Sequence, residues 1–144
     1  MNINNQREQY KNCIFLAGPS GQNSGRKQLI SLLSESVPFF DPTITTDSEW
    51  SPRDHENKTV CLDTCLRLIY ILPENYSPAD IFDIGSLSEQ FCENFLFLYL
   101  GSQVKYDVAQ IVSKIIEKGG KIAESLNDAA QIINRVYTPH TFTL

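Results

Sequence analysis

Short apolar runs alternate along the chain with segments whose apolar residues recur at helical spacing. The apolar runs predict buried strands at residues 12–17, 37–40, 66–72, 94–100 and 121–123. The other segments predict helices at 24–36, from 51 onward, and at 77–91, 102–118 and 125–136. Continuous apolar strands joined by crossover helices are typical of a parallel sheet with both faces covered. The pattern therefore predicts one α/β domain of the flavodoxin- or Rossmann-like type, with five parallel strands in the order 2-1-3-4-5 and helices on both faces.

The starts of three predicted helices share one pattern, Ser-x-x-Asp. It occurs at Ser51, Ser77 and Ser125, each followed three residues later by an aspartate. In such a capping box the serine and the acid bond to each other's backbone N–H groups, and proline after the first two serines favours the first helical position. At the other end of the 102–118 helix, Gly119 and Gly120 predict the stop. We expect the folded core to span residues 12–136, between a polar N-terminus and a C-terminal tail.

The composition limits the classes of partner. The chain of 144 residues carries a formal charge of −5, and its 12 lysines and arginines form no cluster along the sequence. Nucleic-acid polymers and anionic membranes both attract basic patches, so neither is an expected partner. No apolar run approaches the roughly 20 residues that span a bilayer, and the N-terminus lacks the apolar segment of a signal peptide. We expect a cytoplasmic protein that binds a small molecule.

The four cysteines lie within periodic segments instead of loops. Cys61 and Cys65 have a C-x3-C spacing, but no pair of histidines accompanies them, so a zinc site is not expected. Buried, reduced thiols are the better interpretation for these two and for Cys13 and Cys92.

A ligand site is expected at the carboxyl ends of the predicted strands. In open parallel sheets ligands bind outside those ends, at the switch point beside the first strand. The first loop there begins Gly18-Pro19-Ser20-Gly21, and its glycines let the backbone approach a ligand. A phosphate-binding P-loop does not fit, because Arg26 follows the last glycine where that motif has lysine. We predict substrate binding at these four loop residues, with a simple turn between strand and helix as the alternative.

Further binding residues are expected in the second and third loops of the same edge. Asp41 follows the second strand, and Trp50 and Arg53 flank the start of the next helix, where they could stack on a base or hold a phosphate. Simple packing of Trp50 and a solvated position for Asp41 are the alternatives. Tyr76 precedes the 77–91 helix, where it is a candidate for contact with a sugar.

Two aspartates at the start of the 77–91 helix are the candidate catalytic residues. Pro78 favours the first helical position, which places Asp80 and Asp83 three residues apart on one face. A helix N-terminus stabilises a carboxylate, so we expect Asp83 to be ionised and to act as a nucleophile or base. Its apolar neighbours favour a buried or half-buried position for it, with a solvated position on the surface as the alternative. Asp80 either serves as the capping acid or supplies a second catalytic group.

Several motifs together resemble the nucleoside 2-deoxyribosyltransferase-like family. Ile14-Phe-Leu-Ala-Gly-Pro19 is similar to its first strand, and Leu68-Ile-Tyr-Ile-Leu-Pro73 is similar to its third. Asp83-Ile84-Gly85 resembles the acidic helix start that follows that strand, and Gly119-Gly-Lys-Ile-Ala-Glu-Ser-Leu126 resembles the last strand and helix. The resemblance covers residues 12–136 in the same order along the chain, and it implies the same parallel α/β fold.

This resemblance implies chemistry at an N-glycosidic bond. The family's transferases attack the anomeric carbon of a deoxynucleoside with a glutamate at a helix start, and Asp83 stands at that position here. Relatives hydrolyse the bond instead, and the fold is similar to that of TIR-type enzymes that break down NAD. The implied substrate is a nucleoside, a nucleotide or an NAD-like molecule, and the reaction uses side chains without a metal or organic cofactor. A non-catalytic nucleotide-binding or protein-interaction module on the same fold is the alternative.

Self-association is also expected. Apolar side chains in the 77–91 helix extend beyond one narrow stripe, at Ile81, Phe82, Ile84, Leu87 and Phe91. A helix that is apolar over most of its circumference needs cover on a second side, and a two-fold partner supplies it. The resemblance points the same way, because family members complete each site with a neighbouring subunit. We expect a homo-oligomer, with a C-terminal tail folded back over the helix as the alternative.

Overall fold

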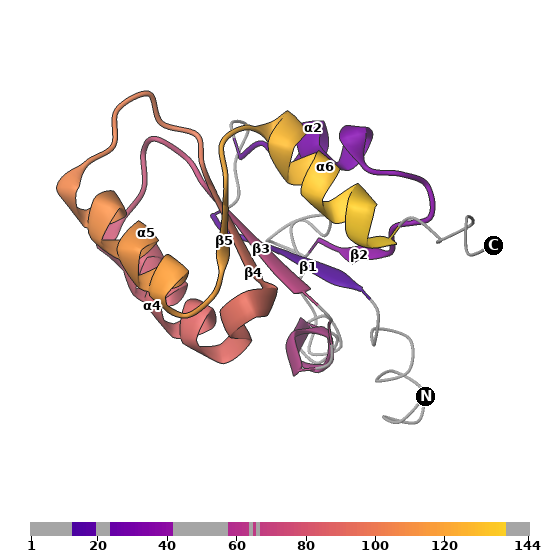
Figure 1. Cartoon of the computed structure of the whole chain (residues 1–144), viewed down its shortest axis with the longest axis horizontal. Helices are drawn as coiled ribbons and strands as arrows, with labels where there is room; N and C mark the ends of the chain where they lie inside the picture. The colour runs from indigo at the N-terminus through magenta and orange to yellow at the C-terminus, as the bar shows by residue number, and fades with distance from the viewer. Residues whose placement is uncertain (1–12, 20–23, 42–57, 64, 66, 138–144) are drawn as a thin grey trace, which may run out of the picture.

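The sheet has five parallel strands in the order β2-β1-β3-β4-β5, which confirms the predicted topology (Figure 1). The computed structural model describes residues 13–19, 24–41, 58–63, 65 and 67–137. The strands are β1 (Ile14–Ala17), β2 (Phe39–Phe40), β3 (Arg67–Leu72), β4 (Phe95–Tyr99) and β5 (Lys121–Ala123). Because the chain leaves β1 for one neighbour and later returns to the other, the switch point lies between β1 and β3.

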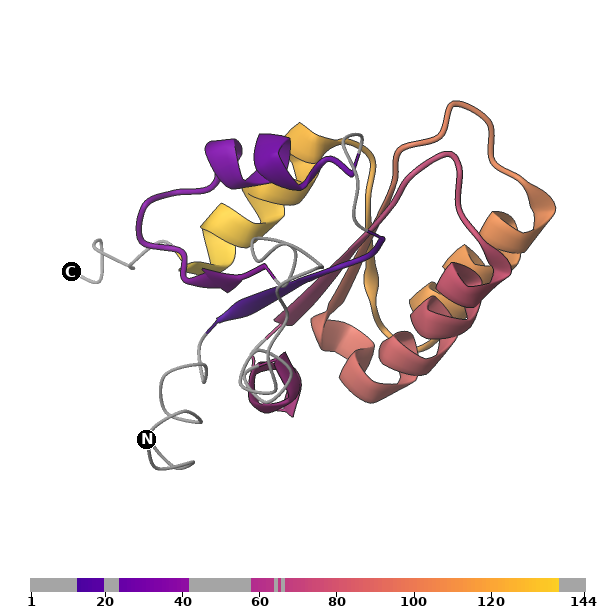
Figure 2. The same cartoon turned by 180° about the vertical axis from the view of Figure 1, so that it is seen from behind.

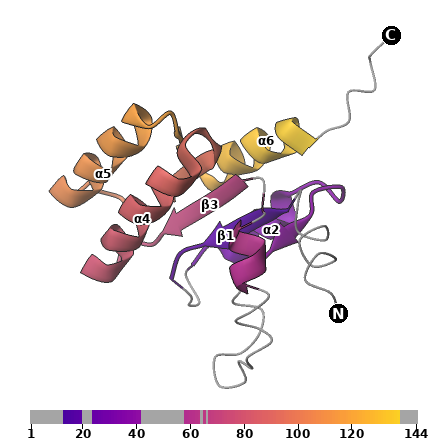
Figure 3. The ribbon, with the colours of Figure 1, turned by 90° about the horizontal axis from the view of Figure 1, so that it is seen from below.

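Helices cover both faces of the sheet, also as predicted (Figures 1 and 2). One face is covered by α4 (Pro78–Phe91), α5 (Tyr106–Glu117) and the helical residues 58–63, and the other by α2 (Arg26–Leu32) and α6 (Leu126–Tyr137). Figure 3 shows α4 and α5 side by side, with the 58–63 helix beneath β1. A short 3₁₀ helix, η2 (Cys92–Asn94), joins α4 to β4. Within the described residues, no helix combines the length and apolar character needed to cross a membrane.

Successive residues of each strand pack into two separate hydrophobic cores, one on each face of the sheet. Phe15, Leu68 and Phe97 point to the face under α4 and α5, whereas Leu16 and Ile69 point to the face under α2 and α6. The period of two in side-chain direction explains this division. Because both faces are buried, the central strands carry apolar residues at nearly every position.

The capping chemistry of α4 and α6 follows the sequence pattern. The Ser77 N–H donates to Asp80 Oδ2 at 2.8 Å, and the capping box of α4 is complete. At α6 the Asp128 N–H donates to Ser125 Oγ at 3.0 Å, but the Asp128 carboxylate accepts from the Glu124 N–H, one residue earlier than predicted. The third predicted pattern, at Ser51, lies outside the described residues.

The end of α5 is also as predicted, but its start is not. Gly119 has a φ of +90°, and bonds from its N–H to Ile116 O and from the Gly120 N–H to Ile115 O close the helix. The helix begins at Tyr106, with Lys105 as its N-cap, and not at residue 102, whose hydroxyl donates to Glu74 Oε1. Val104 lies within the predicted helix range of 102–118, but it precedes the observed helix and is 68% exposed.

Candidate functional site

A cavity of about 320 Å³ opens at the carboxyl end of β1 and β3, at the switch point of the sheet. Its floor is formed by Phe15 and by Ala17 and Tyr70, which are direct partners across β1 and β3. Gly18 and Pro19 line it where the chain leaves β1. The predicted location of the ligand site and two of its four predicted loop residues therefore meet in one hollow.

The start of α4 provides the acidic wall of this cavity. Asp80, Asp83 and Leu87 follow one another at helical spacing, and all three line it. Both cap bonds from Ser77, from its N–H and its hydroxyl, go to Oδ2 of Asp80. Asp83 is exposed at the rim, which is the solvated alternative and not the buried or half-buried position that was favoured, because its apolar neighbours Phe82 and Ile84 lie on other sides of the helix.

Tyr70 is a buried titratable group whose hydroxyl lies near these two acids. It is 2% exposed, and its hydroxyl donates to the backbone oxygen of Asp80 at 3.4 Å. Burial raises the pKa of Tyr70 well above its ordinary value, the carboxylates of Asp80 and Asp83 raise it further, and Arg26 opposes them. The phenol therefore stays protonated and can act as a hydrogen-bond donor throughout the neutral range.

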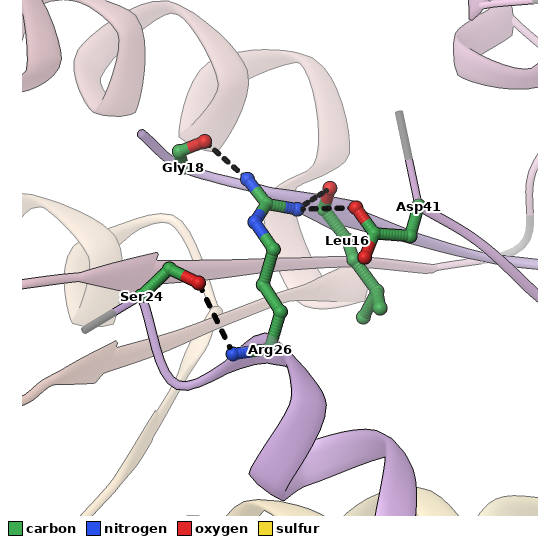
Figure 4. A network of polar contacts seen from close by, with 5 residues as sticks. All are labelled: Leu16, Gly18, Ser24, Arg26 and Asp41. Carbon is green, nitrogen blue, oxygen red and sulfur yellow. Dashed lines mark hydrogen bonds and ion pairs between the residues drawn. The ribbon is translucent and has the colours of Figure 1, made fainter. Parts of the chain in front are cut away.

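Arg26 is the first residue of α2 and lines the cavity as a buried cation, 3% exposed (Figure 4). Its Nη1 donates to Leu16 O at 2.6 Å and to Asp41 Oδ1 at 3.1 Å, and its Nη2 donates to Gly18 O. Burial lowers the pKa of Arg26, and the charge of Asp41 opposes that shift. The guanidinium keeps its charge because arginine titrates far above neutral pH. It therefore ties the exit of β1 to the residue that follows β2.

Gly18 is required by the way β1 meets β3. Its φ is +120°, and a Cβ built at this position would lie 2.3 Å from the backbone oxygen of Ile71. A side chain would push the two strands apart at the mouth of the cavity. The glycine thus serves close packing of the backbone, in addition to lining the cavity.

Two of the predicted binding residues, Asp41 and Tyr76, do not line the cavity. Asp41 is buried behind Arg26, in an ion pair, where a solvated loop or a ligand contact was predicted. The Tyr76 hydroxyl donates to Asp107 Oδ1 at 2.6 Å, its ring meets Tyr99 edge-on at 6.2 Å, and Lys105 Nζ lies 5.0 Å from its centroid. It therefore joins the loop before α4 to the start of α5. The remaining four, Ser20, Gly21, Trp50 and Arg53, lie outside the described residues.

Sequence reasoning missed Tyr70, Arg26 and Lys58 as residues of the site. Tyr70 could have been found from the alternation along β3, since it shares a face with Leu68 and Leu72 under α4. Arg26 stands at a helix start on the ligand edge, and Asp41 follows the second strand at the same edge. The sequence therefore offered an ion pair between these two residues as a hypothesis. Lys58 lines the cavity from the 58–63 helix.

Comparisons with known proteins do not assign a family to this chain. No match is found to the chain among family models, curated proteins or solved structures. In the part of the chain that the structure describes, no group of three or more His, Cys, Asp or Glu side chains could hold a metal ion.

The buried ion pair gives a prediction about stability. Replacing Arg26→Met leaves the Asp41 carboxylate buried without its cation, and we expect a loss of about 3–5 kcal/mol in the free energy of unfolding. The double variant Arg26→Met/Asp41→Leu should lose less free energy of unfolding than the two single variants lose together, because it removes both charges. Urea unfolding of the four proteins measures this coupling. Lys27→Met, on the exposed neighbour, is the control, and strictly additive losses at residues 26 and 41 would contradict the pairing.

Tyr70 gives a prediction about pH. Its pKa is raised in the folded protein, so the unfolded chain loses the phenolic proton first once the pH rises above the ordinary value of 10.0. Stability is then unaffected below that pH and falls above it, by up to about 1.4 kcal/mol per pH unit for this one proton. We expect the slope between pH 10 and 11 to be smaller by about this amount in Tyr70→Phe. Urea unfolding at a series of pH values tests it, and equal slopes would show that the phenol titrates normally.

Proposed function

We propose that this chain acts on the N-glycosidic bond of a nucleoside, a nucleotide or an NAD-like molecule, by deoxyribosyl transfer or hydrolysis, with Asp83 as the nucleophile. The observation that carries the proposal is the composition of the cavity: two carboxylates from one helix start and a protonated tyrosine line the same hollow. Its volume is at the lower end of the range usual for small-molecule sites.

Each of these side chains has a task in such a reaction. Cleavage of an N-glycosidic bond develops positive charge on the sugar, and a carboxylate stabilises that charge or attacks the anomeric carbon. Asp83 suits this role, because its exposed position at the rim leaves its oxygens accessible. The departing base needs a proton, which Asp80 is proposed to supply after taking one up from solvent. Tyr70 is a second donor beside it, and its hydroxyl already bonds to the backbone of Asp80.

A non-catalytic module that binds the same class of ligand is the second candidate. Asp83 carries a carboxylate one methylene shorter than the glutamate of the family that the sequence resembles, which is about 1.5 Å of reach. Small displacements of a catalytic group are costly, whereas binding tolerates them. This candidate predicts affinity for the ligand without release of the base.

Base release from a panel of substrates tests the proposal. The protein is incubated with deoxynucleosides, deoxynucleotides and NAD, and free base is measured by chromatography. We expect release from one class of compound and a loss of at least about 10³-fold in Asp83→Asn, because the nucleophile is removed. Asp83→Glu should retain activity, since it keeps the carboxylate. Glu89→Gln, an exposed acid further along α4, is the matched control and should leave the rate unchanged.

The role of Asp80 needs its own comparison, since Asp80 also caps α4. Ser77→Ala removes the hydroxyl bond of the cap and keeps the carboxyl group, whereas Asp80→Asn removes the acid and keeps an oxygen that can accept from the Ser77 N–H and hydroxyl. A rate lower in Asp80→Asn than in Ser77→Ala supports a role for the Asp80 carboxyl group in the reaction beyond its role in the cap. If no compound releases base and one binds tightly, the binding module is supported and the enzyme is rejected.

We also propose that the protein is a homo-oligomer in which the subunit boundary lies beside the cavity. Phe82, the residue before Asp83, is 75% exposed on α4, and burying its ring in a subunit interface would be favourable. Light scattering at micromolar concentration tests this, with a mass well above the 16.3 kDa of one chain expected. Phe82→Ser should lower that mass, and Ile116→Ser, an exposed apolar residue on α5, should not. A mass near one chain for the unaltered protein would reject the oligomer.

A further inference from the structure

Three cysteines lie together under the cavity, on the face of the sheet covered by α4. Cys13, just before β1, and Cys61, on the 58–63 helix, are buried in the same core cluster, and Cys65 packs against it from a half-buried position. All three are reduced thiols, as is Cys92 at the far end of α4. The proposed glycosidic chemistry uses none of them.

Cys61 and Cys65 are spaced so that they can form a disulfide. The Cys65 N–H donates to Cys61 O at 2.7 Å, which is the bond of one α-helical turn. Four residues of helical rise separate the two Cα atoms by about 6 Å. Disulfides join Cα atoms roughly 4.4–6.8 Å apart, so little movement of the backbone is needed.

The two thiols are also unequal. The hydrogen bond from the Cys61 thiol lowers the pKa of Cys65, and the same bond together with burial raises the pKa of Cys61. Cys65 is therefore the more readily ionised thiol of the two, and it is the one that solvent reaches, because Cys61 is fully buried. A low pKa, partial exposure and an adjacent second thiol are the features of cysteines that respond to oxidants.

We propose that Cys61 and Cys65 form a site of reversible oxidation by hydrogen peroxide. The Cys65 thiolate attacks one peroxide oxygen, the O–O bond breaks, and a proton completes the water that leaves, so Cys65 becomes a sulfenic acid. The Cys61 sulfur then attacks the Cys65 sulfur, the S–O bond breaks, and the thiol proton leaves with the hydroxyl as a second water. Two thiols are oxidised to one disulfide, and one peroxide is reduced to two waters.

The position of this pair connects it to the cavity. Leu62 follows Cys61 in the chain and lines the cavity, and Lys58 lines it one turn earlier on the same helix. A disulfide between Cys61 and Cys65 closes a covalent ring that includes the backbone of Leu62. The modification site is independent of the reaction proposed above, and it exists whether or not the chain cleaves a glycosidic bond.

Tryptic mapping gives a direct test, because cleavage after Lys58 and Arg67 places both cysteines in one peptide, residues 59–67. The full chain is treated with one to a few equivalents of hydrogen peroxide, remaining thiols are alkylated, and the digest is analysed without reduction. We expect peptide 59–67 to lose two hydrogens and to escape alkylation, with reduction by dithiothreitol restoring it. A cross-link between peptides 12–26 and 59–67 would identify Cys13 as the partner and overturn the proposed pairing.

Cys92 is a matched control for reactivity. Like Cys65 it is half-buried, and both sulfurs donate to a carbonyl three residues back, Leu62 O for Cys65 and Glu89 O for Cys92. Cys65 should be oxidised at least about tenfold faster than Cys92 in the folded protein, and this difference should disappear in urea. Equal rates in the folded protein would reject the site.

Two variants separate the roles of the thiols. Cys61→Ser should stop the reaction at the sulfenic acid of Cys65, trapped by dimedone, whereas Cys13→Ser should still form the 59–67 disulfide. If Cys61→Ser does not fold, the map of the unaltered protein decides alone. Oxidation of Cys65 directly to sulfinic acid in that protein, without a disulfide, would overturn the role of Cys61.

Discussion

The buried guanidinium of Arg26 holds the ligand edge of this fold together. It accepts no hydrogen bonds and can be buried only because acceptors surround it, the carbonyls of Leu16 and Gly18 and the carboxylate of Asp41. These acceptors come from the end of β1, the turn after it and the residue after β2. β2 itself has only two residues, and the ion pair adds an attachment to its pairing with β1. The turn that lines the cavity is positioned by the same contacts.

This arrangement also sets the charge around the cavity. Arg26 lies against the wall, but its charge is balanced by Asp41 on its far side, so Asp80 and Asp83 face the hollow with Lys58 as the other nearby cation. Tyr70 responds to both carboxylates and to Arg26, which shows that these groups share one electrostatic environment. A ligand that gains positive charge would be stabilised here, and an added anion would meet two carboxylates.

The sequence predicted those parts of the structure that depend on local pattern. Strand order and the faces of the helices follow from apolar runs and crossovers, and the position of Asp80 follows from its serine and proline neighbours. The pairing of Arg26 with Asp41 depends on where two strand ends meet in space, which no local pattern contains. The exposure of Asp83 depends on how far α4 turns before its apolar face meets the sheet. Its role in catalysis, like those of the loop residues, stays a prediction.

The two outer strands of the sheet carry a consequence for assembly. β2 and β5 are two and three residues long, Pro38 precedes β2 without an N–H to offer, and β5 begins with the exposed Lys121. Long, flat outer strands invite further strands from other molecules, and short ones with proline or lysine resist them. The margins of this sheet are therefore poor places for another chain to add a strand, and the helix surfaces are the better candidates for any contact between copies.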